Sequence, residues 1–170
     1  MDRLLKTGAL ALALSCSSGL LLADSIASYP ENWRDWPIVS ESMVPGSDVV
    51  LPEDTPLFIQ EAVSAYNWIN DGQGTKLTVH VHPDKIEQYK THGPYDDGIT
   101  VIGVYETPGV IFVTEHLAGQ PLYGTYDYHG VDISEQHATF APEFCERCHT
   151  AYQDICINGT CSTSVIELFD

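Results

Sequence analysis

The chain has 170 residues, with 7 Lys and Arg against 24 Asp and Glu and a formal net charge of −17. This length suffices for one domain with a hydrophobic core, and the ordinary apolar content predicts little disorder. The negative charge argues against nucleic acid and anionic membrane surfaces as partners, because both attract basic proteins. It is compatible with solubility alone or with attraction of a basic redox partner.

The N-terminus has the pattern of a targeting segment. Two basic residues precede an apolar stretch over residues 10–22. A small-x-small cleavage signature ends at Ala27, and Leu21-Leu22-Ala23 is a second candidate cleavage site. The stretch is too short to span a membrane comfortably. We therefore expect residues 1–27 to be a signal peptide and residues 28–170 to be a single exported domain, periplasmic or secreted, without membrane insertion.

The first predicted elements after this segment are helices and turns. Residues 29–36 predict a short helix with Pro near its first turn, and turns rich in Pro and acidic residues follow it. Apolar side chains recur near helical spacing over residues 57–70 and predict a longer helix. Residues 77–82 alternate apolar and polar side chains, as a half-buried strand does, and a short helix is expected from Pro83 to about Lys90.

The second half of the chain predicts mainly strands. Residues 99–105 and 110–114 are rich in β-branched side chains and are joined by a Pro-Gly turn, which predicts an antiparallel hairpin. A third strand is expected at 123–129, then a loop or short helix over 132–141, and a last strand at 165–169. The expected fold class is α+β, a small antiparallel sheet with flanking helices and a C-terminal haem-attachment segment.

Cys145-Glu146-Arg147-Cys148-His149 is the C-x-x-C-H pattern of c-type haem attachment. The two thiols reach two vinyl groups on one edge of a porphyrin, and the next residue offers an imidazole to the iron. The sequence thus predicts one covalent haem c with His149 as the metal ligand. A zinc half-site and a redox dithiol are the alternatives, but the sequence has no second ligand pair at zinc spacing and no βαβ context.

Two further cysteines, Cys156 and Cys161, flank a predicted turn at Asn158-Gly159. Ser162 follows the second one, so this is not another haem motif. In an oxidising compartment we expect a local disulfide, with free thiols as the alternative.

Other residues are candidates for the surroundings of the haem. Arg34 and Arg147 are considered as partners of the propionates, with ordinary surface charge as the alternative. His116 and His129 flank the central strands and are candidates for distal haem residues. His80 and His82 share one strand face, where the two could bind a metal ion, although histidines on a polar strand face more often have no such role. Four aromatic side chains are candidates for the wall of a distal pocket that excludes water. Each could instead be an ordinary residue of the hydrophobic core. They are Phe112, Tyr126, Tyr128 and Phe140.

The order of these motifs resembles the cytochrome P-460 family, which includes the cytochromes c′-beta. The likeness rests on the Trp-Arg-Asp-Trp segment at 33–36, the strand, helix and Asp-Gly turn over 79–98, and a single haem motif close to the C-terminus. The resemblance implies a homodimer and a five-coordinate haem, with His149 proximal and a distal site open to small ligands.

The chain departs from the family pattern at one position. Hydroxylamine-oxidising members carry a Lys that cross-links to the porphyrin, and the matching position here is about Gly103, with no Lys after Lys90. This argues against hydroxylamine oxidation and for the c′-beta branch, which binds NO or a related nitrogenous ligand. Glu143 matches an acid that some active members hold over the haem, where a buried carboxylate with a raised pKa would shuttle protons; a solvated loop Glu is the alternative.

These observations leave three functions open. The leading expectation is binding of NO or a similar small ligand at an open distal site. The second is an electron-transfer cytochrome c, and the third is a hydroxylamine oxidase or peroxidase that uses Glu143.

Overall fold

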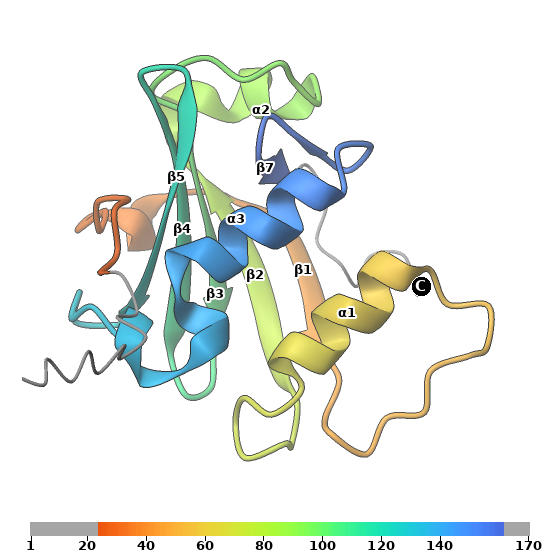
Figure 1. The fold of residues 1–170 in the computed structure, drawn as a ribbon. Helices are drawn as coiled ribbons and strands as arrows, with labels where there is room; N and C mark the ends of the chain where they lie inside the picture. Colours follow the sequence, from red (N-terminus) through yellow and green to blue (C-terminus); the bar gives the residue numbers. More distant parts are fainter. Residues whose placement is uncertain (1–23, 162–170) are drawn as a thin grey trace, which may run out of the picture.

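A computed structural model describes residues 24–161 of the chain. Most of the predicted signal peptide and the predicted strand at 165–169 lie outside this range. The five main strands form one antiparallel meander in the order β1-β2-β3-β4-β5, each pairing with the next along the chain (Figure 1). The strands are β1 (Ile38–Val44), β2 (Thr75–Val81), β3 (Thr100–Tyr105), β4 (Val110–Leu117) and β5 (Gln120–Asp127).

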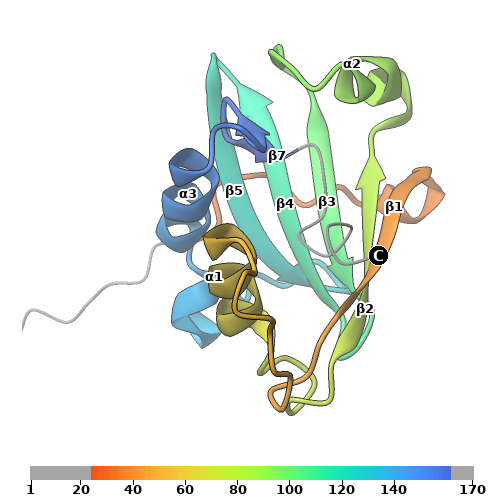
Figure 2. The same cartoon turned by 90° about the vertical axis from the view of Figure 1, so that its right-hand side faces the viewer.

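Three α-helices and a small second sheet complete the described fold. The helices α1 and α3 lie over one face of the sheet, and α2 lies at one end of it (Figure 2). A two-stranded hairpin follows α3 and contacts α1 through Cys156. The elements are α1 (Leu57–Tyr66), α2 (Ile86–Lys90), α3 (Pro142–Ala151), β6 (Cys156–Ile157) and β7 (Thr160–Cys161), with single 3-10 turns at Trp33–Asp35, Pro83–Lys85, Ser134–Gln136 and Ala138–Phe140.

The predicted α+β class and most predicted elements are confirmed. The structure adds a strand that the sequence did not predict, β1, an edge strand whose side chains are mostly exposed or half-buried. Its mixed pattern gave no clean alternation because an irregularity between Ile38 and Ser40 shifts its register against β2. The predicted helix over 57–70 ends earlier, at Tyr66, and Asn70 and Asp71 adopt positive φ values that no helix allows.

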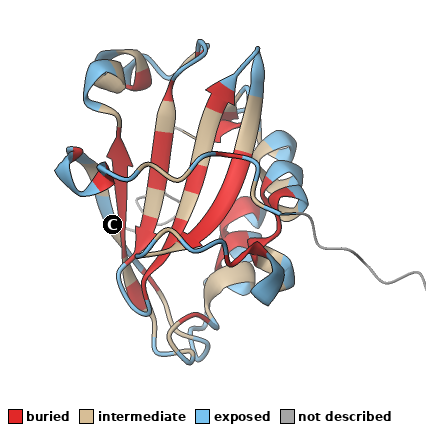
Figure 3. Ribbon diagram, turned by 90° about the vertical axis from the view of Figure 1, so that its left-hand side faces the viewer, coloured by how far each residue is buried: buried red, intermediate tan, exposed pale blue. Residues whose placement is uncertain are grey.

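The two faces of the sheet have different cores. Alternate residues of β3 and β4, including Ile102 and Ile111, pack against Trp33 and Trp36 of the N-terminal segment. The residues between them, such as Val101 and Tyr105, point to the face that carries α1 and α3. In Figure 3, buried positions run along β2, β3, β4 and β5, as expected for a sheet covered on both sides.

The segment that precedes the 3-10 turn at 33–35 is part of this fold. The backbone N–H groups of Ile26 and Ala27 donate to the Tyr123 carbonyl at 2.9 and 3.0 Å, and the buried Tyr126 hydroxyl donates to the Ala27 carbonyl. Ser25 also bonds through its backbone and side chain to Asp132. Cleavage after Ala27 would remove these contacts, whereas cleavage after Ala23 retains them. None of the described helices is long and apolar enough to cross a membrane.

We predict that a chain beginning at Ser28 is less stable than one beginning at Asp24. It loses several hydrogen bonds worth about 1 kcal/mol each and leaves the buried Tyr126 hydroxyl without its acceptor, so the free energy of unfolding should fall by about 2–4 kcal/mol. Urea unfolding of the two chains measures the difference. Equal midpoints would show that residues 24–27 contribute nothing to the fold.

Candidate functional site

The predicted haem-attachment residues share one side of α3. The helix begins with Pro142 at its first turn, where the missing N–H is tolerated. Cys145, Cys148 and His149 stand three and four residues apart, so they project from neighbouring turns on the same helix face. This face looks toward the sheet, where the ring of Tyr123 on β5 meets the His149 ring edge-on at 5.1 Å.

These three side chains line one cavity between α3, α1 and the sheet. Its volume is about 140 Å³, below the usual range of about 300–1,000 Å³ for small-molecule sites, and it opens to solvent. The walls are mainly apolar and aromatic. The other lining residues are Phe58, Ala62, Tyr66, Leu77, Val79, Tyr89, Val101, Gly103, Tyr105, Phe112, Thr114, Tyr123, Thr160 and Cys161.

The tautomer of His149 follows from its hydrogen bond. Its Nδ1 lies 2.9 Å from the Gly159 carbonyl oxygen, which can only accept, so Nδ1 carries the proton. Burial lowers the pKa of His149, which keeps the imidazole neutral. The lone pair is therefore on Nε2, the arrangement found in metal-binding histidines whose other nitrogen donates to a carbonyl.

The thiols of the motif are poor nucleophiles in this environment. Burial is the main cause that raises the pKa of Cys145 to about 12, and burial followed by the charge of Glu61 raises the pKa of Cys148. Reactive dithiols instead have lowered pKa values in electropositive surroundings. The site therefore disfavours the redox-dithiol alternative.

The other cysteines form the predicted disulfide, Cys156–Cys161, which joins the two strands of the hairpin. Its sulfur atoms and a nitrogen of His149 lie within 4.8 Å of one another. A disulfide sulfur is not a thiolate, so this group does not supply the deprotonated ligands that zinc requires. Among the described residues no other cluster of three His, Cys, Asp or Glu side chains is placed to hold a metal ion.

Two phenols contribute polar atoms to the cavity wall. The Tyr66 and Tyr105 rings are 5.7 Å apart, and neither hydroxyl has a hydrogen-bond partner within residues 24–161. Burial raises the pKa of both tyrosines, so they stay neutral donors rather than phenolate ligands. The sequence did not single them out, although alternation along residues 101–105 placed Tyr105 on the same face as Gly103.

The aromatic candidates divide between the two faces of the sheet. Phe112 lines the cavity and Phe140 packs behind it, with ring centroids 5.6 Å apart and no place in the cavity wall. Tyr126 belongs to the core cluster of the opposite face, and Tyr128 packs against that cluster. Adjacent strand residues point to opposite faces, and the sequence alone did not show which face holds the cavity.

The charged candidates lie outside the cavity. Arg34 is on the opposite face of the sheet, where it donates to the Tyr128 carbonyl at 2.9 Å and lies over the Trp33 ring. Arg147 is exposed and stacks on Phe144 at 4.5 Å. Glu143 is an exposed residue of the first turn of α3, where a carboxylate favours the helix dipole, and it does not line the cavity. The expected buried acid is therefore absent at this position.

The other histidines also have structural partners or solvent. Both ring nitrogens of His80 are bonded, to the Trp36 carbonyl and the Thr78 hydroxyl, and His82 accepts from the backbone of the following 3-10 turn. His116 is buried and bonds to the Asn158 carbonyl, and His129 is exposed. Within the described part of the chain, His149 is the one histidine that lines the cavity.

No protein-family model, curated protein or solved structure matches this chain. The functional assignment therefore depends on the residues of the site.

The environment of His80 predicts a pH dependence of stability. Burial lowers its pKa in the folded state, so the unfolded chain binds the proton more readily. Stability should fall as the pH drops below the ordinary imidazole pKa of about 6.5, with a contribution of at most about 1.4 kcal/mol per pH unit. Denaturant unfolding between pH 7 and 5 should show a shallower slope for His80→Gln; identical slopes would contradict this assignment.

Proposed function

We propose that this protein is an exported mono-haem c-type cytochrome that binds NO or a related small ligand at an open distal site. The observation that carries the proposal is the convergence of Cys145, Cys148 and His149 on one largely apolar cavity. Thioether bonds from the two thiols and an iron bond from His149 would hold one haem c there. Export to the periplasm and assembly as a homodimer are further parts of this proposal.

The cavity walls fit such a group. The proton on Nδ1 of His149 leaves Nε2 as the nitrogen that would bind iron, and the apolar walls would exclude water from a porphyrin face. Haem supplies an iron centre that binds diatomic ligands when one axial position is open. No second His and no Lys or Met line the cavity in residues 24–161, which supports five-coordinate iron.

The positions of the acidic residues bear on the alternatives. Because Glu143 is exposed, the structure offers no support for a proton shuttle at that residue, and an oxidase or peroxidase based on it is not favoured. An electron-transfer role would rest on the net charge of −17, which also serves solubility. Ligand binding is therefore the function that the cavity supports best.

We predict that the chain acquires one covalent haem when it is exported from a host that attaches haem c. Its mass should increase by that of one haem, and alkaline pyridine treatment should give the absorption spectrum of a thioether-linked haem. Cys145→Ser/Cys148→Ser should lose the covalent haem completely, because it lacks both thiols that form the bonds. Cys156→Ser/Cys161→Ser is the matched control and should retain it. A colourless exported protein without added mass would overturn the proposed function.

We predict that the ferrous protein is high-spin and binds CO and NO, and that filling the cavity from the sheet weakens binding. A Cβ added at Gly103 meets only the Leu77 Cδ1 atom, at 3.5 Å, so larger residues there should be tolerated by the fold. Gly103→Leu should lower CO affinity at least tenfold, or about 1.4 kcal/mol, and Gly103→Ala by much less. CO titration followed by absorbance measures both. A low-spin haem that binds neither gas would favour electron transfer instead.

A further inference from the structure

The hairpin that follows α3 is tied to its surroundings by four side chains. Cys156 and Cys161 pair across it, and Asn158 and Gly159 form a two-residue turn with φ values of 49° and 76°. Positive φ at both positions is the requirement of a type I′ turn, which Asn-Gly satisfies best. Three of its carbonyl groups accept hydrogen bonds from the side chains of His116, Tyr123, His149 and Tyr89.

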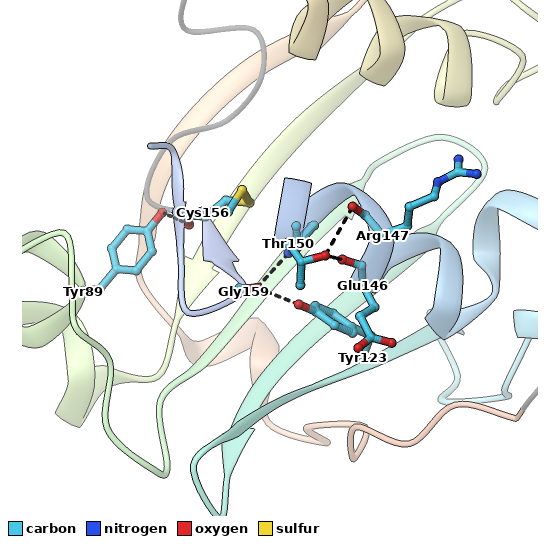
Figure 4. Close-up of a disulfide and its surroundings, with 9 residues drawn as sticks. Tyr89, Tyr123, Glu146, Arg147, Thr150, Cys156 and Gly159 are labelled. Carbon is cyan, nitrogen blue, oxygen red and sulfur yellow. Dashed lines mark hydrogen bonds between the residues drawn. A yellow bond between two sulfur atoms is a disulfide. The ribbon is translucent and has the colours of Figure 1, made fainter. Parts of the chain in front are cut away.

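The Gly159 carbonyl is the centre of this arrangement. It accepts from the Nδ1–H of His149 and from the Tyr123 hydroxyl, each at 2.9 Å. Figure 4 shows the bond between Tyr123 and Gly159. A carbonyl oxygen has two lone pairs, so both donors are accommodated, but they share its electron density. The fit is close, because a Cβ at Gly159 would lie 2.5 Å from the Tyr123 hydroxyl oxygen.

The neighbouring carbonyl groups fix the turn in place. The Nε2–H of His116 donates to the Asn158 carbonyl at 2.9 Å, and the Tyr89 hydroxyl donates to the Cys161 carbonyl at 3.2 Å. These donors come from β4 and α2, whereas Tyr123 comes from β5. The position of the Gly159 oxygen is therefore set by three elements of the main fold together with the disulfide.

We propose that this disulfide-closed hairpin is a clamp that orients His149 and sets its strength as an axial ligand, with Tyr123 as a positioning residue. The proposal rests on the proposed haem function. The hydrogen bond from Nδ1 to the Gly159 carbonyl fixes the tautomer with its lone pair on Nε2, and it increases the basicity of Nε2. Tyr123 moderates that bond by sharing the same acceptor, and its ring edge restricts rotation of the imidazole.

The test is the iron–histidine stretching frequency of the ferrous haem protein, measured by resonance Raman spectroscopy. Tyr123→Phe keeps the ring and removes the competing donor, so the frequency should shift upward. Cys156→Ser/Cys161→Ser removes the disulfide and loosens the carbonyl, so the frequency should shift downward, and a larger fraction of the ferrous nitrosyl form should lose its histidine ligand. Tyr128→Phe is the matched control, because that hydroxyl bonds to the Glu106 carbonyl away from the cavity.

The outcomes separate this proposal from the one on which it rests. Absence of haem in the unaltered protein would end the proposed function. If haem is present but Tyr123→Phe and Cys156→Ser/Cys161→Ser both have the iron–histidine frequency of Tyr128→Phe, only the clamp proposal is overturned. If the variant without the disulfide fails to fold, Tyr123→Phe decides: a shifted frequency supports the clamp and an unshifted one overturns it.

Discussion

The packing of α3 against the sheet is the constraint on which the rest of the site depends. Helical spacing puts Cys145, Cys148 and His149 on one side of α3, but a helix face becomes a site only when something lies opposite it. Here the opposite wall is the central part of the sheet, and α1 closes a third side. If α3 turned about its own axis, the same three residues would face solvent.

The sheet provides this wall because its two faces are filled differently. The N-terminal segment seals one face with Trp33 and Trp36, so β3 and β4 are fully packed on that side. On the other face, α1 and α3 stand apart from the middle of the sheet, and Gly103 adds no side chain there. Close packing is the norm in protein interiors, and this apolar cavity of about 140 Å³ is a local departure from it beside Cys145, Cys148 and His149.

Backbone carbonyl groups accept the hydrogen bonds of several polar side chains near this cavity. The Asn158-Gly159 turn exposes acceptors that cannot be protonated or removed by ordinary side-chain substitution, and buried side chains from distant parts of the chain satisfy them. The direction of each bond fixes a tautomer. His149 and His116 thus have defined protonated nitrogens because their partners can only accept.

The sequence by itself determined the local features of this protein. Periodicity predicted most of the strands and helices, the cysteines that flank the Asn158-Gly159 turn predicted a local disulfide, and the C-x-x-C-H motif singled out Cys145, Cys148 and His149. These features depend on residues that are close in sequence, because the regular repeat of the backbone fixes how such residues lie relative to one another. Only the tertiary structure decided which sheet face holds the cavity, which excluded Arg34 and included Tyr123. It also decided which side of α3 faces the cavity, which excluded Glu143. That choice depends on contacts between segments tens of residues apart, which local patterns do not encode.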